Sequence, residues 1–506
     1  MGKKQIYNID FISERAIITI TNMMLLCSIL KLHSSDMTGD LQMHNLLSVN
    51  SMLKPKQIAG ELPSTSAAYK NFYKIAWPSA LEALLVGLVG SVDTIMVGTL
   101  GKGAITAVGI TNQPKFILLA MITSLNIGVT AVTARRKGQA DQGGANQVLR
   151  SGILLSAMIS LVMSLLGYLF AKPILLLAGA EQSYLKDAMD YFKIIMISIP
   201  FQALNLTINA AQRGCGKTKI SMTTNIVSNI VNIIFNYFLI NGIGLFPKLG
   251  VRGAAIATAM GACAAFCISL ATLFKKNNYL SFRHKSRWSL KRRTIGPVVK
   301  VSGSAFVEQV FMRVGFLAYA AIIARLGTTE YATHLICMNI LSLSFAFGDG
   351  LSIAASALVG QNLGARRPDL SIIYGKVGQR LAFLISSIIF FVFLFGRTFL
   401  VSLFSTEAAV LALGSNILIL AALGTHAQTS QVVMSGCLRG AGDTNFVAAT
   451  SFISVAIIRP LLTWLLCYPV GLGLYGAWIA LLLDQVFRVI TSFRRFSGGK
   501  WSSINL

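Results

Sequence analysis

The sequence predicts an all-α integral membrane protein, in which twelve transmembrane helices form two pseudo-symmetric lobes of six helices each. Three observations lead to this prediction: an apolar composition, twelve long apolar segments, and an internal repeat with an offset of 226 residues. Of the 506 residues, 54% are hydrophobic and 12% are charged, and the mean hydropathy is +0.66. No soluble core of this length could bury so much apolar surface, so the composition indicates a multi-pass membrane protein.

Apolar segments of roughly 20 or more residues recur from about Phe72 onward, and as helices they are long enough to cross a hydrocarbon core of about 30 Å. The first six predicted spans lie near 74–98, 104–133, 148–170, 187–211, 219–242 and 253–274. The second six lie near 297–326, 331–359, 374–396, 408–436, 443–468 and 473–492.

The N-terminal residues 1–70 differ in character from the spans. Their apolar run from Ala16 to Leu30 is short and broken by polar residues, so we predict a disordered or peripheral extension rather than a thirteenth span. The predicted organisation is an extension at 1–70, a first lobe at 71–275, a basic cytoplasmic linker at 276–294, a second lobe at 295–495 and a cytoplasmic tail at 496–506.

The repeat is clearest at polar landmarks. Adding 226 to the position of Glu82 gives Glu308, and the same offset converts Gly138 into Gly364 and Gln202 into Gln428. The segment from Arg213 to Thr218 recurs in the same way as the segment from Arg439 to Thr444. One six-helix unit therefore occurs twice, which favours a transport site between the two lobes.

The formal charge of +26 is explained by topology rather than by nucleic acid. Lys and Arg collect in alternate loops, such as 135–137 and 275–293, whereas the intervening loops are nearly free of cations. This is the positive-inside pattern, and it predicts that both termini are cytoplasmic.

The sequence offers no enzyme or cofactor site. Seven cysteines are scattered without metal-ligand spacing, so we predict no disulfide and no metal. The segment from Gly214 to Thr218 resembles the end of a phosphate-binding loop, but residue 211, where the motif needs glycine, is alanine. His334 and His426 are single residues in spans, typical of packing or hydrogen bonding. Any uphill transport must then draw on an ion gradient.

Acidic residues inside the spans are the strongest functional signal, because an unpaired charge at the bilayer centre costs several kcal/mol. Glu82 and Asp93 are eleven residues apart, about three helical turns, so both lie on one face of the first span. Glu308 repeats Glu82, so acid would line a cavity between the lobes from both sides. The alternative is that these carboxylates are buried by hydrogen bonds for packing alone.

Two further acidic residues lie inside the spans, and their neighbours suggest different roles. Asp484 precedes Arg488 by four residues, and an ion pair along the helix is the preferred interpretation. Asp349 lies between two glycines, where the helix is either bent and water-lined or simply packed.

Amide side chains complete the candidate cavity. Asn225, Asn229, Asn232 and Asn236 form one stripe on the fifth span, which either joins helices by hydrogen bonds or lines a polar cavity. Repeat symmetry relates Gln202 to Gln428, and Asn205 follows Gln202 by three residues. The candidate substrate-cavity residues are Gln202, Asn205, Asn232, Asn236, Asp349 and Gln428.

At this point the residues resemble the multidrug and toxic compound extrusion (MATE) transporters over nearly all of positions 70–500. The first-lobe signature is Trp77-Pro78, then Leu-Glu82-Ala-Leu-Leu, then Val92-Asp93-Thr-Ile-Met-Val-Gly98. The second-lobe signature is Leu358-Val-Gly-Gln-Asn-Leu-Gly-Ala365, then Leu438-Arg-Gly-Ala-Gly-Asp-Thr444.

The resemblance implies two lobes forming a V, and alternating access that exports a drug in exchange for inward H⁺ or Na⁺. It implies that Asp93 is the coupling aspartate, that Pro78 is the hinge of the first span, and that Glu308 belongs to a cation site. With Glu82, these acids form the predicted ion-coupling set. Some family members carry acids where this chain has Gln428 and Asn236, which favours H⁺ over Na⁺ here.

The expected partners are small-molecule drugs, mostly lipophilic cations, together with H⁺ or Na⁺ and membrane lipids. No cofactor and no nucleic acid are expected, and the protein is expected to act as a monomer in the plasma membrane. The alternative is a lipid-linked oligosaccharide flippase of the same wider superfamily. Such flippases commonly present a basic cavity, whereas the acids singled out above predict an acidic one.

Overall fold

The computed structural model describes residues 48–243, 246–276, 278–284, 286, 288 and 290–504. In this part of the chain, twelve helices are long and apolar enough to cross a membrane, as the sequence predicts. The chain divides after Ser51, and Met52–Leu506 form one compact unit. The predicted extension at 1–70 lies mostly before this division, and its apolar run at 16–30 lies outside the described residues.

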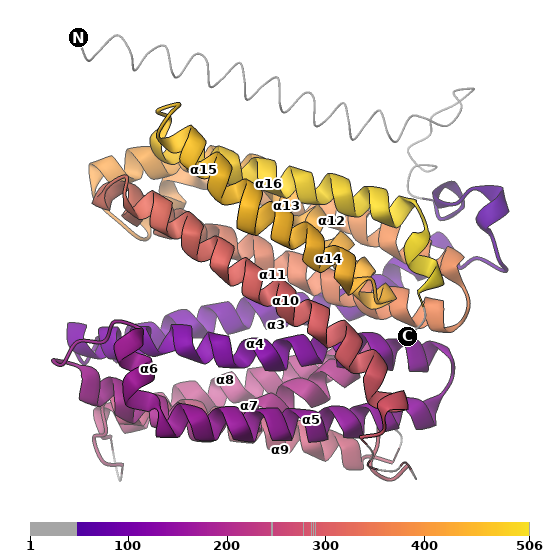
Figure 1. Cartoon of the computed structure of the whole chain (residues 1–506), viewed down its shortest axis with the longest axis horizontal. Helices are drawn as coiled ribbons and strands as arrows, with labels where there is room; N and C mark the ends of the chain where they lie inside the picture. The colour runs from indigo at the N-terminus through magenta and orange to yellow at the C-terminus, as the bar shows by residue number, and fades with distance from the viewer. Residues whose placement is uncertain are drawn as a thin grey trace. The chain divides into compact units, whose positions relative to one another are not determined.

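The first lobe contains six long helices and one short helix, drawn in indigo to magenta in Figure 1. They are α3 (Thr65–Gly98), α4 (Lys102–Gly138), α5 (Gln142–Leu169), α6 (Ala171–Leu177), α7 (Leu185–Gly214), α8 (Thr218–Asn241) and α9 (Val251–Phe274). The first span begins at Thr65, earlier than the sequence indicates, because Ser64 caps it: the Oγ atom accepts a hydrogen bond from the Ala67 amide at 3.3 Å.

The second lobe repeats this plan with one interruption. Its helices are α10 (Arg292–Ala324), α11 (Thr328–Gly364), α12 (Pro368–Ser402), α13 (Ala408–Ala441), α14 (Thr444–Ser451), α15 (Arg459–Cys467) and α16 (Gly473–Ser497). A π-helical segment, η3 (Phe452–Ile458), joins α14 to α15, so these three elements together make one span. Such π-helical segments are frequent at functional sites.

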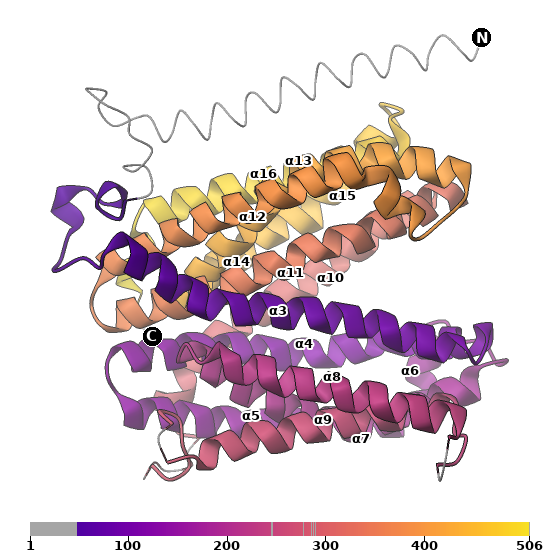
Figure 2. The same ribbon diagram turned by 180° about the vertical axis from the view of Figure 1, so that it is seen from behind.

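The first helix of each lobe also packs against the other lobe. Helix α3 packs on α8 of its own lobe and on α11 of the second lobe, as Figure 2 shows from behind. Helix α10 packs on α14 of its own lobe and on α4 of the first lobe. This exchange is the spatial counterpart of the sequence repeat.

The lobes meet most closely where α4 and α11 end. A Cβ atom on Gly138 would lie 1.7 Å from the Gln361 carbonyl oxygen, and one on Gly364 would lie 2.1 Å from that of Arg135. The repeat relates these two glycines, so each copy of the unit supplies one. Only glycine allows this backbone contact. We call this the basic-loop end, because Arg135–Lys137 and Arg366–Arg367 lie there.

Candidate ion-coupling site

The first-lobe site is built around Asp93, near the end of α3. The Asn236 amide nitrogen on α8 donates a hydrogen bond to Asp93 Oδ1 at 2.7 Å. The same nitrogen lies 3.3 Å from Asn232 Oδ1. Asn232 in turn donates to Thr258 Oγ1 of α9 at 3.2 Å. Three helices therefore hold one carboxylate through two amides and a hydroxyl.

Two further side chains act on this carboxylate. Lys115 of α4 and Tyr191 of α7 lie within electrostatic range of Asp93. Lys115 was not predicted from the sequence, and only its position in the middle of a span could have signalled it. Asn236 Oδ1 is buried and has no hydrogen-bond partner within the described residues. The cluster thus combines a carboxylate, amide and hydroxyl oxygens and a nearby ammonium group, a chemistry that can exchange a proton or hold a hard cation.

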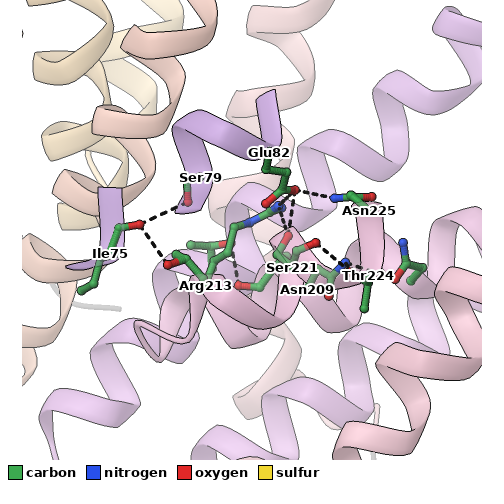
Figure 3. Close-up of polar contacts among 12 residues, drawn as sticks. Ile75, Ser79, Glu82, Asn209, Arg213, Ser221, Thr224 and Asn225 are labelled. Carbon is green, nitrogen blue, oxygen red and sulfur yellow. Dashed lines mark hydrogen bonds and ion pairs between the residues drawn. The ribbon is translucent and has the colours of Figure 1, made fainter. Parts of the chain in front are cut away.

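Glu82 lies eleven residues before Asp93 on α3, and Figure 3 shows its side chain against Ser221 and Asn225 of α8. Its Oε1 accepts hydrogen bonds from Asn225 Nδ2 at 2.5 Å and from Ser221 Oγ at 2.8 Å. Arg213 Nη1 of α7 lies 3.4 Å from the same oxygen and forms an ion pair with it. The carboxylate is therefore neutralised inside the first lobe.

Glu308 repeats this arrangement in the second lobe. Its Oε1 accepts from Arg439 Nη2 at 2.6 Å and from Ser451 Oγ at 3.2 Å. Adding 226 to the position of Arg213 gives Arg439, so both copies of the repeat contain the Glu–Arg pair. The sequence indicated both arginines as part of the repeated motif, but their pairing with the glutamates was missed.

Among the three candidate ion-coupling acids, Asp93 alone lacks an ion pair with arginine in the described part of the chain. The other two have fixed guanidinium partners. Each also keeps a second oxygen that is buried without a partner, Glu82 Oε2 and Glu308 Oε2. The polar stripe on α8 spans both first-lobe acids, because its ends, Asn225 and Asn236, contact Glu82 and Asp93.

The predicted cavity residues fall in different places. Asn232 and Asn236 belong to the Asp93 cluster. Asn205 is buried in the first lobe and accepts from Asn209 Nδ2 at 3.1 Å. Gln428 is buried in the second lobe, and both atoms of its amide lack a partner among the described residues. Gln202 on α7 is half-buried.

Asp349 is the exposed member of the cavity set. It lies on α11 within electrostatic range of Arg439, the partner of Glu308. In the part of the chain that the structure describes, no hydrogen bond joins Asp349 or Gln428 to the Asp93 cluster. The described residues therefore contain one compact polar cluster at Asp93, and the other predicted cavity residues lie apart from it.

The hinge candidate Pro78 lies inside α3, one turn before Glu82. Because proline has no N–H, it cannot close the helical hydrogen bond to the Lys74 carbonyl group. One residue on, the Ile75 carbonyl oxygen accepts from Thr218 Oγ1 at 2.9 Å and from Ser79 Oγ at 3.4 Å (Figure 3). The weakened turn is thus tied to α8.

The second lobe holds a buried charge cluster that the sequence only partly indicates. The predicted pair is present, with Arg488 Nη2 3.4 Å from Asp484 Oδ2. Arg459 also pairs with Asp484, through its Nε atom at 3.0 Å. All three side chains are buried inside the lobe. Arg459 was missed, because only packing brings α15 onto α16.

Comparisons with known proteins agree with this architecture. The MatE family model matches residues 78–238 and again residues 304–465, and the second match begins 226 residues after the first. A probable multidrug resistance protein NorM of Thermotoga maritima is 26% identical over 437 residues, covering 85% of this chain and 93% of that protein. The multidrug resistance protein PmpM of Pseudomonas aeruginosa is 28% identical over 410 residues, covering 81% and 84%.

Solved structures share the fold. A MATE crystal structure in the bent conformation aligns with a TM-score of 0.79 at 19% identity, over 86% of this chain and 97% of that one. An outward-facing multidrug resistance MATE transporter aligns with a TM-score of 0.80 at 19% identity, over 85% and 96%. The repeat, the twelve spans and the double family match together lead to one conclusion: the chain belongs to the MatE family of multi-pass membrane transporters and is not an enzyme.

Proposed function

We propose that this protein is a secondary active multidrug efflux antiporter that exports lipophilic, mostly cationic drugs in exchange for H⁺ or Na⁺ by alternating access. It acts as a monomer in the plasma membrane, among lipids that cover its apolar faces, with both termini cytoplasmic. The names of relatives such as NorM and PmpM support the drug-export part of this proposal.

The observation that carries the proposal is the Asp93 cluster. A carboxylate inside a span, held by Asn236 and by the Asn232 to Thr258 bridge, is costly to maintain in a membrane and is explained by ion coupling. Glu82 and Glu308 support this role as acids that are paired with arginine. Each has one carboxylate oxygen without a partner, so each can change its partner during transport.

The coupling ion that we favour is H⁺. Where some family members carry acids, this chain has the neutral amides Asn236 and Gln428. Both substitutions lower the fixed negative charge available to Na⁺. Lys115, which lies within electrostatic range of Asp93, opposes Na⁺ binding further, because an ammonium group competes with a bound cation.

The drug class follows from the exposed acid. Asp349 on α11 is exposed, and a carboxylate offsets part of the cost of desolvating a lipophilic cation that binds against it. Efflux of a fluorescent lipophilic cation from energised vesicles tests the function directly. Vesicles that extrude the dye when a pH gradient is applied, and stop when it is collapsed, support the proposal. Dye retention equal to that of vesicles without the protein contradicts it.

A lipid-linked oligosaccharide flippase is the second candidate. One observation favours it: Arg313 on α10 is exposed, and its guanidinium lies 5.3 Å from the centroid of the Phe116 ring on α4. In the described part of the chain no carboxylate pairs with Arg313. A cation at this helix seam could meet a lipid phosphate. Translocation of a labelled lipid-linked oligosaccharide, without dye efflux, would favour this function.

A further inference from the structure

The segment before α3 is docked on the second lobe. Residues 52–64, which we call the N-terminal strap, run along α12. Lys376 Nζ donates to the Met52 carbonyl oxygen at 2.6 Å. Met52 and Leu53 are 1% and 8% exposed, so apolar burial adds to this contact.

A charged pair, of which only Asp369 is fully buried, holds the middle of the strap. Asp369, which is fully buried, accepts a hydrogen bond from the Ala59 amide at 3.2 Å. Arg367 pairs with Asp369 at 2.8 Å, and the same nitrogen, Nη2, donates to the Glu61 carbonyl oxygen at 2.8 Å. A clamp that acts on backbone groups fixes the position of the strap whatever its side chains are.

The strap continues into α3, whose first turns stay on the second lobe. Arg380 Nη1 of α12 lies 3.3 Å from the Tyr69 hydroxyl group. Phe72 is fully buried, and its ring would be 3.0 Å from a Cβ atom on Gly378 of α12. The polar contacts of α3 with the first lobe begin at Ile75, whose carbonyl oxygen accepts from Thr218 Oγ1, and continue through Glu82 and Asp93. The strap thus anchors α3 to the second lobe, although α3 carries the candidate ion site of the first lobe.

The C-terminal residues make the opposite connection. Residues 499–504, which we call the C-terminal tail, follow α16 of the second lobe. Trp501 is fully buried, stacks on Phe496 with ring centroids 4.7 Å apart, and donates through Nε1 to the Phe496 carbonyl oxygen at 2.6 Å. The tail then reaches α4 of the first lobe, where Arg135 Nη2 donates to the Ile504 carbonyl oxygen at 2.7 Å.

We propose that the N-terminal strap and the C-terminal tail form a latch between the lobes, which holds the basic-loop end closed and has to release before that end can open. Each segment ties an element of one lobe to the other lobe at this end. They reinforce the direct contact there, in which Gln361 Nε2 of α11 donates to the Gly214 carbonyl oxygen of α7 at 2.8 Å. Arg135, Arg367 and Asp369 are accordingly positioning residues for transport.

A native thiol reports on this end. Cys215 lines a cavity of about 450 Å³ between α3, α4, α11 and α12, together with Lys74, Asn362 and Tyr374. Burial raises the pKa of the Cys215 thiol to about 12, so it is almost fully protonated and unreactive while the end is closed. Opening this end exposes the thiol to water and restores its reactivity.

The test is maleimide labelling of purified full-length protein in which the other cysteines are replaced by alanine. Those residues are Cys27, Cys263, Cys267, Cys337, Cys437 and Cys467. We expect Arg135→Gln and Arg367→Gln each to speed Cys215 labelling by about tenfold, the effect of losing a hydrogen bond to a charged group. Their neighbours are the matched controls.

Arg136→Gln and Arg366→Gln remove the same charge without touching either segment. Arg136 pairs within the first lobe with Asp141, and Arg366 is exposed. We expect parental labelling rates from both controls. Equal rates in all four variants would overturn the latch. If a latch variant does not fold, truncation after Gly498 decides the question in the same way, because it removes the tail and leaves the residues of α16 in place.

The inference rests on the proposed alternating access, but the two can fail separately. Labelling needs no drug and no ion gradient. Faster labelling in the latch variants of a protein that shows no dye efflux would uphold the latch and reject the antiporter. Dye efflux that depends on Asp93, combined with unchanged labelling, would reject the latch and leave the antiporter standing.

Discussion

At the scale of single residues, the deciding feature is how each buried acid is paired. Glu82 and Glu308 each have an arginine partner, whereas Asp93 is held by the Asn236 amide with Lys115 nearby. The guanidinium group of each arginine lies against the glutamate as a fixed counter-charge. An amide donor leaves the Asp93 carboxylate free to exchange its proton or to bind a cation. This difference is the basis for proposing Asp93 as the residue that exchanges the ion.

The first prediction is that Asp93→Asn abolishes ion-coupled efflux. Asparagine keeps the size of the side chain but can neither release a proton nor neutralise a cation, so drug resistance should fall to the level of cells without the transporter. Immunoblots of membrane fractions should show an unchanged protein level. Asp187→Asn, at an exposed aspartate of α7, is the control. Wild-type resistance in Asp93→Asn would refute the assignment.

The second prediction concerns the Glu–Arg pair of the second lobe. Glu308→Gln leaves Arg439 partly buried without its counter-charge, and we expect it to lower the free energy of unfolding by about 2–3 kcal/mol. Adding Arg439→Gln should recover part of that loss, because the unpaired charge is gone. Thermal unfolding in detergent measures both changes. Glu407→Gln, at an exposed position, should have no effect; strictly additive losses in the double variant would exclude the coupling.

At the scale of helices, the close crossing of α4 and α11 closes the basic-loop end. The crossing depends on Gly138 and Gly364, which the repeat relates and which bring the two backbones into contact. The π-helical segment between α14 and α15 serves a different purpose. Its Ser454 side chain contacts Asp484, so one side of the segment meets the buried charge cluster of the second lobe, whereas Phe452, Ile453 and Ile457 are exposed on the other.

The third prediction follows from that crossing. Gly138→Ala places a methyl group where the Gln361 carbonyl oxygen lies, so the two helices have to separate, at a cost of about 1–3 kcal/mol. We expect a lower melting temperature and faster maleimide labelling of Cys215. Gly109→Ala on the same helix meets no atom within 4 Å and is the control. A melting temperature as high as that of the control would show that the crossing tolerates a side chain.

At the scale of the whole molecule, two copies of one unit have diverged. Both keep a Glu–Arg pair, but the position of Asp93 is occupied by Tyr319 in the second lobe, where the hydroxyl group donates to the Ala477 carbonyl oxygen at 3.1 Å. The second lobe instead buries the charge cluster around Asp484. In the part of the chain that the structure describes, the lobes therefore share the Glu–Arg pair and differ in their other charged side chains, with the Asp93 cluster in the first lobe and the Asp484 cluster in the second.

The fourth prediction is the orientation of the molecule. Positive-inside sorting places the loop at 275–291 and both termini in the cytoplasm. A reporter that is active only outside the cytoplasm should stay silent when fused in this loop, and should be active in the loop after α3 at 99–101. Activity in the basic loop would invert the proposed direction of transport.

The fifth prediction separates the two candidate ions. Vesicles loaded with a pH gradient alone should drive dye efflux, and vesicles with a Na⁺ gradient at equal pH should drive little, because Asn236 and Gln428 are neutral. Asp93→Asn should silence both conditions. Full transport driven by Na⁺ at equal pH would show that the amides coordinate the metal ion and that the preference for H⁺ is wrong.

The sequence by itself determined the span count, the repeat and the family, because hydrophobic length and motif spacing are local properties of the chain. It also placed Asp93 and the asparagine stripe correctly on their helices, because helical periodicity fixes which residues share a face. Both the Asp93 to Asn236 contact and the Glu82 to Asn225 contact use that shared face of α8.

Only the tertiary structure decided which charges meet. Arg213 comes to Glu82 and Arg439 to Glu308 across 131 residues of sequence, and Lys115 approaches Asp93 from a different helix. The docking of the strap and the tail was equally invisible, because their contacts use backbone carbonyl and amide groups, which every residue carries. Pairing between distant helices depends on how their faces pack, and hydropathy and periodicity record only which face is polar.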